Sequence, residues 1–508
     1  MKLNHIKKHL DITKKLMTMS VVLGLSFVFS ADYLSQTDIG IDVSNDSIVK
    51  KKKQIQILGA TVIERDPNIS FASRLIGNVK LGLEDAVLTC DSAYRFEDGR
   101  FEVFSNVHII ESSGIEVWAD YAVLDPEVDA VEISGDVRFI HEEFSIECPA
   151  LVYDLESKLV SYNQRAEIVE GNRVLSSDNG VYSSNTDRLY AGGEVDIIEN
   201  DDHIISDSLA IDRNDKTLIL FKRSTLKIEG AIIKCDKGNY NGRLEKGWFA
   251  GHASMEDEGG YLAGDSIVVS RNDEEGTAWG NITVRDSSGA MTIFGDYAKR
   301  TNNYDLVEGE LVRLINIEEG DTLKMNSRNL VREDNMLYVF GGVVFEQGDF
   351  SGLGDSLSWD RNSNEIWLLG EPVVWSDEDE MTGDTVKMTL KENRPELMKL
   401  MGHANVLSPS NDSLDHQISG RDLDAVFKGG ELSLVDVSGN GTIQYYSTDN
   451  EDIVSLNRAS CAHIRIVFLD GSVSRITLLN NPEGHFENLT KESKANYPVK
   501  TRRAKPKL

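Results

Sequence analysis

A series of aspartates forms the most regular polar pattern in the sequence. Each ends a motif of an apolar residue, any residue, a small residue and Asp, as in Leu88-Thr89-Cys90-Asp91. Carboxylates gathered in this way could bind a cation or act as acid and base. A short carboxylate also accepts local backbone N–H bonds at turns, which favours Asp there. We therefore predict structural corner residues, with a ligand role as the alternative. They are Asp91, Asp120, Asp178, Asp207, Asp236 and Asp265.

Other signatures of enzyme or metal chemistry are missing from the sequence. It contains no Gly-x-Ser-x-Gly elbow, no phosphate-binding Gly-rich loop ending in Lys-Ser/Thr and no His-Glu-x-x-His. The acidic stretches at 272–275 and 377–380 lack the alternating ligand spacing of a calcium loop, so we expect solvated loops there. The sequence therefore predicts a non-enzymatic protein without catalytic residues, metal or cofactor.

Three of the four cysteines, Cys90, Cys148 and Cys235, occupy the small position of the motif, which Ala119 fills in another copy. They are therefore interpreted as small buried residues. Strands are about 4.8 Å apart, so residues two or more repeats apart lie about 10 Å or more from each other, beyond the ~7 Å limit for a disulfide. We predict free, buried thiols, and leave the state of Cys461 open.

The elements that position these residues follow from the repeat itself. The small residues of the motif stand at equal intervals, at positions 90, 119, 148, 177, 206, 235 and 264. Further copies follow with small slips, giving about 13 repeats of about 29 residues each. A fixed period of this length indicates stacked repeats, in which each unit buries its apolar face against its neighbours.

Each repeat has a second half, a Gly-containing turn followed by alternating apolar residues, as in Gly77-Asn78-Val79 and Gly280-Asn281-Ile282. Period-two alternation with β-branched residues predicts strands, two for each repeat. Apolar residues fall two before the small residue and then three and five after it, as Ile204 is followed by Leu209 and Ile211. This change of parity predicts a bend or β-bulge just after the small residue.

The 508 residues carry 53 Lys and Arg against 84 Asp and Glu, a formal charge of -31. This charge disfavours nucleic acid as a partner.

Residues 1–31 are predicted to be a secretory signal, because lysines precede an apolar run at 16–29. The run has about 14 residues, whereas a segment that spans a bilayer needs about 20. We expect a linker at 32–55 and the repeats at 56–407. Residues 408–486 are expected to be degenerate C-terminal repeats of the same array or a second small β body. Residues 487–508 are expected to form a basic flexible tail. The tail is either a solvated end or a contact for anionic lipid headgroups or an acidic partner.

The exported chain, with its apolar-x-small-Asp motifs and its Gly-Asn-Val turns, resembles the OstA-like (LptA-like) family over about residues 56–486. The family comprises periplasmic lipopolysaccharide-transport proteins and the soluble N-terminal part of the outer-membrane lipopolysaccharide assembly protein. The resemblance implies an all-β, repetitive, twisted open β-jellyroll, or β-taco, whose apolar groove holds lipid A acyl chains. It also implies protomers or partner domains joined edge to edge. This chain is much longer than the single-domain bridge protein of the family.

These observations predict a periplasmic protein, free or associated with the outer membrane, that carries lipopolysaccharide or a related glycolipid toward that membrane. At about 0.8 kcal/mol per buried CH₂, a chain of about 12 to 14 carbons is stabilised by roughly 10 kcal/mol. Expected partners are other lipopolysaccharide-transport proteins bound through edge strands, with self-association as a further option. The alternative is a closed β-solenoid, a structural or cell-surface scaffold without lipid. The predicted groove residues are Leu88, Val117, Ile146, Leu175, Ile204, Ile233, Leu262 and Ile282.

Overall fold

A computed structural model describes residues 55–508, except 66–71, 84, 129, 319, 393, 412–413, 430, 450–451, 470–471, 490–501 and 507. Residues Lys53–Leu508 form one compact unit. The predicted signal segment and nearly all of the predicted linker lie outside the described residues, and so does most of the basic tail. In the described part no helix is long and apolar enough to cross a membrane.

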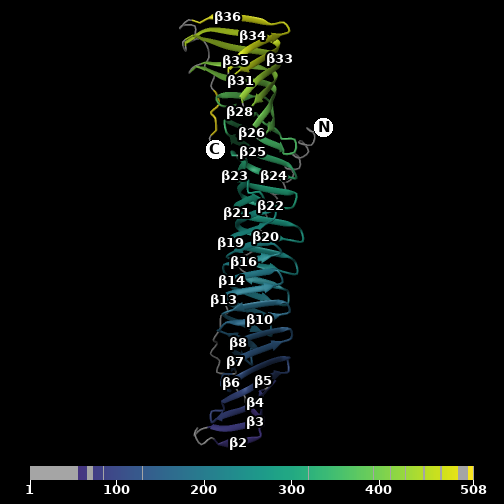
Figure 1. The fold of residues 1–508 in the computed structure, drawn as a ribbon, viewed down its shortest axis with the longest axis vertical. Coiled ribbons are helices and arrows are strands. Elements are labelled where there is room, and N and C mark those ends of the chain that lie inside the picture. Colours follow the sequence, from purple (N-terminus) through teal and green to yellow (C-terminus); the bar gives the residue numbers. More distant parts are fainter. Residues whose placement is uncertain are drawn as a thin grey trace, which may run out of the picture. The chain divides into compact units, whose positions relative to one another are not determined.

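Antiparallel strands of one sheet make up the fold, and the described residues contain no helix. Successive strands lie beside one another in chain order (Figure 1). Most are long strands of ten or more residues. These are β3 (Ala72–Leu83), β4 (Ala86–Phe96), β5 (Phe101–Glu111), β6 (Ile115–Asp125), β7 (Ala130–His141), β8 (Phe144–Asp154), β13 (Arg188–Glu199), β14 (Asp202–Asp212), β19 (Lys246–Asp257), β20 (Gly260–Ser270), β21 (Glu275–Asp286), β22 (Met291–Arg300), β23 (Tyr304–Glu318), β24 (Asp321–Glu333), β25 (Met336–Gln347), β26 (Phe350–Asp360), β31 (Arg394–Asn411), β32 (Leu414–Lys428), β33 (Glu431–Asp449) and β34 (Asp452–Leu469).

The remaining strands are shorter, and each pairs with one half of a long strand. These are β1 (Gln56–Gly59), β2 (Val62–Arg65), β9 (Leu159–Tyr162), β10 (Ala166–Glu170), β11 (Arg173–Ser177), β12 (Asn179–Ser183), β15 (Thr217–Leu220), β16 (Ser224–Ile228), β17 (Ala231–Cys235), β18 (Lys237–Asn241), β27 (Glu365–Leu369), β28 (Val373–Ser376), β29 (Asp379–Thr382), β30 (Thr385–Lys391), β35 (Ser472–Leu479) and β36 (Glu483–Asn488).

Each long strand is interrupted near its middle by a β-bulge. The ladder between β4 and β5 shifts between Thr89 and Ser92, so the bulge contains the small residue and the Asp of the motif. The ladder between β3 and β4 shifts between Ile76 and Val79. There Gly77 and Asn78 both have positive φ, 74° and 46°, a conformation that Gly and Asn tolerate best. The predicted bend is confirmed, and it lies at the small residue and the Asp.

The bulges line up along one line, the seam, and divide the sheet into two walls. Wall A contains segments such as 86–90 and 107–111, and wall B contains segments such as 92–96 and 101–104. The ladders on each side of a bulge join segments of the same wall. The outer ends of both walls are hairpin turns, and we call the line between these two rows of turns the mouth. One sheet folded along one seam thus forms a trough.

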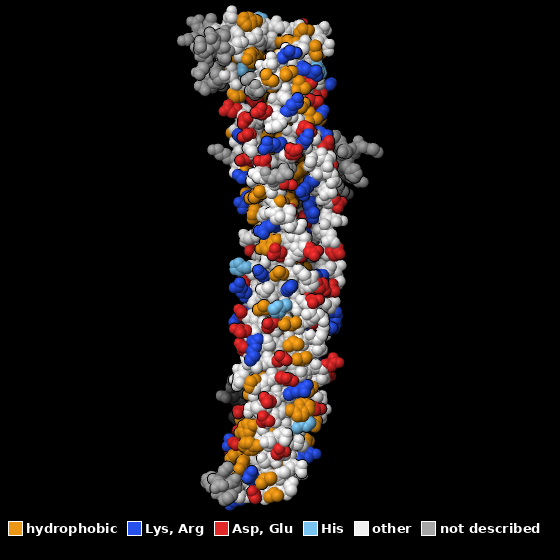
Figure 2. All heavy atoms as spheres, in the orientation of Figure 1, with side chains coloured by type: hydrophobic (Ala, Val, Ile, Leu, Met, Phe, Trp, Pro, Cys, Tyr) orange, Lys and Arg blue, Asp and Glu red, His pale blue; other side chains and the backbone are white. Residues whose placement is uncertain are grey.

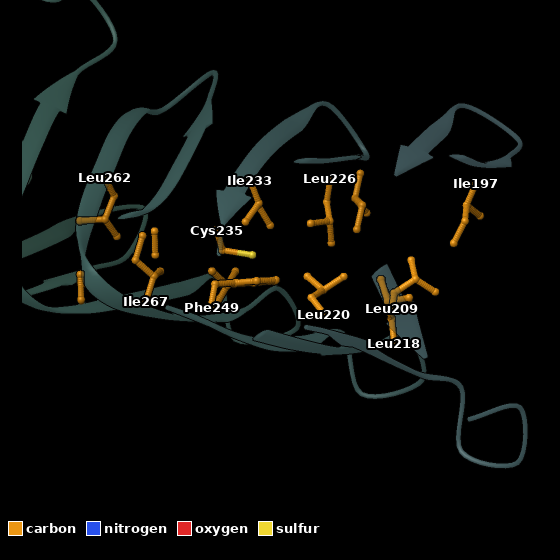
Figure 3. Packing of buried hydrophobic residues seen from close by; sticks show 14 of the residues in the cluster. Ile197, Leu209, Leu218, Leu220, Leu226, Ile233, Cys235, Phe249, Leu262 and Ile267 are labelled. Atoms are coloured by element: carbon orange, nitrogen blue, oxygen red, sulfur yellow. The ribbon is translucent and has the colours of Figure 1, made fainter. Parts of the chain in front are cut away.

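The interior faces of the two walls pack on each other and form the core. Figure 3 shows Ile197, Leu226, Ile233 and Leu262 of wall A opposite a row from wall B. That row consists of Leu209, Leu218, Leu220, Phe249 and Ile267. On the face seen in Figure 2, acidic and basic side chains are interspersed with scattered hydrophobic ones. The predicted all-β repetitive fold is confirmed.

The ladders continue through the region where the sequence repeat slips. Strands β31 and β32 pair from Leu397 with Val426 to Asn411 with Leu414. Strands β33 and β34 extend the same arrangement, with bulges in each. Whether 408–486 behaves as a separate body stays a prediction.

Candidate functional site

All eight predicted groove residues belong to wall A. Seven of them are buried, with Leu88 and Ile146 fully inaccessible, and Ile204 is half-buried. Seven of them, from Leu88 to Leu262, lie on every second strand of the wall and point into the trough, because the interior position recurs with each repeat. Ile282 lies nearer the seam, opposite Gly295, and it is Val284 that is opposite Leu262.

Between these residues stand equivalent ones that the apolar-x-small-Asp motif did not reveal. Leu88 is directly opposite Ile109, which is opposite Val117, which in turn is opposite Phe139. The same continuous row of cross-strand neighbours extends to Val284. The additional members up to that point are Ile109, Phe139, Ile168, Ile197, Leu226, Met255 and Val284. The signal that identifies such residues is the second apolar position after a Gly-containing turn, as Phe139 follows Gly135.

The N-terminal part of the trough is filled by side chains from both walls. The Phe144 ring of wall A stacks on Tyr182 of wall B with centroids 4.4 Å apart. Phe139 meets Tyr153 edge-on at 6.1 Å. These large rings leave the walls in contact, so this part of the interior is closely packed.

A cavity of about 740 Å³ lies between the walls farther along, and we call it the middle cavity. Its apolar lining includes Ile233, Met255 and Leu262 of wall A and Tyr240 and Phe249 of wall B. Its rim carries charged side chains, among them Glu229, Glu245, Asp257, Arg271 and Arg300. Cavities of about 300 to 1,000 Å³ with apolar linings and few polar groups are typical of small-molecule sites.

A second cavity of about 600 Å³, the C-terminal cavity, repeats this arrangement. It is lined by Met325, Phe345, Trp359, Met388 and Phe468. Its rim is acidic, with Glu318, Asp321, Asp349, Asp377, Asp379 and Glu431 against Arg394. Both cavities therefore combine an apolar interior with a charged opening.

The described end of the basic tail lies beside this rim, where Lys505 Nζ donates to the Asp349 carbonyl oxygen at 3.4 Å. Arg502 forms an ion pair with Asp415 and donates to the Glu378 carbonyl oxygen at 3.0 Å. The Arg503 backbone N–H donates to Glu380 Oε2 at 2.8 Å. These contacts give the tail an acidic partner within its own chain.

Charged contacts also cross the mouth of the packed N-terminal part. The Glu111 carboxylate at the end of β5 is 3% exposed and pairs with Lys158, which precedes β9. Burial would raise the pKa of Glu111, but hydrogen bonds from Lys158, Ser113 and Tyr153 outweigh it and hold the pKa below its ordinary value. The carboxylate is thus kept ionised inside the trough.

The aspartate series lies at the seam, on the far side from the mouth. Asp91 Oδ2 accepts a hydrogen bond from Asn106 Nδ2 at 2.8 Å, and Asp265 accepts from Asn281 in the same way. The prediction of corner residues is confirmed. The partner is an Asn side chain of the adjoining bulge at Asp91 and Asp265, whereas Asp178 contacts Arg165 and Asp236 contacts His252. In the described residues no group of three or more His, Cys, Asp or Glu could hold a metal ion.

All four cysteines are free and buried, as predicted for the three in the motif. Burial raises the pKa of the Cys90 and Cys148 thiols to about 11 and that of Cys235 to about 12. Such thiols stay protonated near neutral pH and are poor nucleophiles.

Comparison with known families agrees with the resemblance noted in the sequence. Residues 52–207 match the family model described as OstA-like protein. This segment covers the first part of the trough, from β1 to the middle of β14, and includes five of the predicted groove residues. No curated protein matches the chain. The resemblance is therefore confirmed for residues 52–207.

Proposed function

We propose that this chain is a non-enzymatic lipid-binding protein that carries lipopolysaccharide toward the outer membrane, with the acyl chains of lipid A held in the trough. The match of residues 52–207 to the OstA-like model supports a transport-associated role.

The observation that carries the proposal is the pair of cavities between the walls. Their volumes, about 740 and 600 Å³, suit several alkyl segments, and their linings combine apolar side chains with charged and polar ones. Because strand pairing joins the walls along the seam and does not cross the mouth, an acyl chain can enter sideways through the mouth while its headgroup stays in water. Burial of each CH₂ then contributes about 0.8 kcal/mol.

The charged rims determine where the headgroup lies. Acidic residues predominate at the C-terminal cavity, and they repel the phosphates of lipid A. We therefore expect sugars and phosphates to remain outside the mouth, close to Arg271 or Arg300 of the middle cavity.

The partners in this proposal are other lipopolysaccharide-transport proteins and a second copy of the chain. Strand β2 at one end of the ladder pairs with β3, and β36 at the other pairs with β34. End strands with unpaired backbone groups favour the addition of a strand from a neighbour.

The test uses a photo-crosslinking residue at Leu262, which lines the middle cavity, and at Ile205 as a matched control. Ile205 belongs to the same wall, but its side chain points outward and is 49% exposed. In cells, Leu262 should capture lipopolysaccharide and Ile205 should not. Equal capture at both positions, or capture of protein alone at Leu262, would contradict the proposal.

A scaffold without lipid is the second candidate, and the packed N-terminal interior favours it. Leu88, Val117, Ile146 and Leu175 are at most 1% exposed. If the interior is dry throughout, a lipid supplied to the purified protein will leave the hydrogen exchange of both cavity linings unchanged. Protection of β19 and β20 by lipid argues for transport.

A further inference from the structure

Three acidic residues on the wall A side of the mouth recur at equal spacing and contact basic residues from wall B. They stand at positions 111, 170 and 229, so each step corresponds to two repeats. Each basic partner lies in or beside a hairpin turn of wall B. The pairs are Glu111 with Lys158, Glu170 with Arg213, and Glu229 with Arg271.

The first pair is the most deeply buried. Glu111 also accepts hydrogen bonds from Tyr153 Oη at 2.8 Å and from Ser113 Oγ at 2.7 Å. Tyr153 belongs to wall B, so two separate groups of that wall are bound to one carboxylate of wall A. This contact holds the outer edge of wall A against the outer edge of wall B.

The second pair is also integrated into the packed interior. Arg213 Nε donates to Glu170 Oε1 at 2.8 Å, and its side chain is 9% exposed. The guanidinium lies over the Phe144 ring at 4.8 Å and also pairs with Asp187. Arg213 thus covers the aromatic side chains that fill the trough beneath it.

The third pair is the loosest and stands at the rim of the middle cavity. Arg271 Nη1 contacts Glu229 Oε2 at 3.0 Å, and the Glu229 side chain is 65% exposed. Both residues line the cavity. Burial of the pairs therefore decreases from the packed part of the trough toward the cavity.

We propose that these three ion pairs form a gate along the mouth, which keeps the N-terminal part of the trough closed until a lipid in the middle cavity displaces them in turn. The inference rests on the proposed function. It reconciles the burial of Leu88 to Leu175 with a role in holding acyl chains, because those residues become accessible when the edges separate. The loose Glu229–Arg271 pair opens first, and the Glu111–Lys158 pair last.

A measurement without lipid tests whether the pairs hold the mouth closed. In Arg213→Gln the central pair is lost, and in Arg138→Gln an ion pair with Glu147 on the outside of wall A is lost instead. We expect a maleimide to label the buried Cys148 about tenfold faster in Arg213→Gln than in the wild type. A factor of about ten is what the loss of one hydrogen bond to a charged group would add to the population of the open mouth. Cys461, far along the sheet, should react as in the wild type. Equal labelling of Cys148 in the two variants overturns the gate.

A second measurement separates the gate from the proposed function. Photo-crosslinking residues at Leu175, below the central pair, and at Leu262, in the middle cavity, are exposed to purified lipopolysaccharide. The gate predicts that in the wild type capture at Leu175 is weaker than at Leu262 and follows it in time, and that capture at Leu175 rises several-fold in Arg213→Gln. Equal capture at both positions in the wild type supports lipid binding and overturns the gate. No capture at either position overturns the proposed function, and the thiol measurement still decides whether the ion pairs close the mouth.

Discussion

Gly135 and Asp120 meet at the seam so closely that the glycine has no room for a side chain. A Cβ added to Gly135 would lie 2.7 Å from Asp120 Cβ, and the φ of Gly135 is 82°. The same contact recurs between Gly193 and Asp178. The Gly of one bulge and the Asp of the adjoining one are therefore a single structural unit, which explains why both recur with the repeat.

Replacing Gly135 by Ala should lower the free energy of unfolding by about 1–3 kcal/mol. The cost has two sources, the positive φ that alanine tolerates poorly and the close contact of the new methyl group with Asp120. Gly114→Ala is the matched control, since Gly114 has a φ of 91° and nothing within 4 Å of its added Cβ. The Gly114→Ala substitution should lower the free energy of unfolding by about 1 kcal/mol or less. Chemical unfolding of the two variants measures the difference. Equal losses would mean that the Asp contact adds nothing.

The buried Glu111 should make stability depend on pH. Its pKa is lower in the folded protein than the ordinary value of 4.5, so the carboxylate stabilises the fold above that value. This contribution is lost as the pH falls through the folded-state pKa. Glu111→Gln removes it, so the variant should be less stable at neutral pH and lose less stability on acidification. Thermal unfolding at a series of pH values checks this. Parallel pH curves for wild type and variant would contradict it.

The repeat length and the alternation of apolar residues are sufficient to predict the two walls, the seam and about half of the residues in the interior row of wall A. The fixed step between motifs identified Leu88 and Val117, because the interior position lies at the same place in every copy. Phe139 was missed because alternation predicts a strand there but not which of its faces meets the other wall. Ile109 was harder to find, since the turn before it has Ser105 and Asn106 at positive φ in place of a glycine.

The mouth contacts could not have been predicted in this way. Glu111 and Lys158 are 47 residues apart, whereas Glu170 and Arg213 are 43 residues apart. Such pairs depend on how far the walls separate, and local strand patterns do not specify that distance. The positions of the cavities could not be predicted either, because they depend on how the side chains of the two walls pack and not on the period of the sequence.

The C-terminal residues should protect the acidic rim of the C-terminal cavity. Deleting residues 501–508 removes the contacts of Arg502 and Arg503 with Glu378, Glu380 and Asp415. Hydrogen exchange in β29 should rise, while exchange in β20 stays unchanged. Raising the salt concentration with the full-length chain should produce a smaller change in the same direction, because the Arg502–Asp415 pair is partly buried and therefore only partly screened. Exchange in β29 that responds to neither treatment contradicts this role.

A large side chain should be tolerated in the middle cavity and rejected in the packed part of the trough. Met255 is half-buried beside the cavity, so Met255→Trp fills existing space and should change the free energy of unfolding by less than about 1 kcal/mol. Leu175 is 1% exposed, and Leu175→Trp should cost about 1–3 kcal/mol through overpacking. Binding of a fluorescent fatty acid to Met255→Trp should decrease severalfold, because the indole occupies the space for the alkyl chain. Undiminished binding in this stable variant would place the lipid outside the middle cavity.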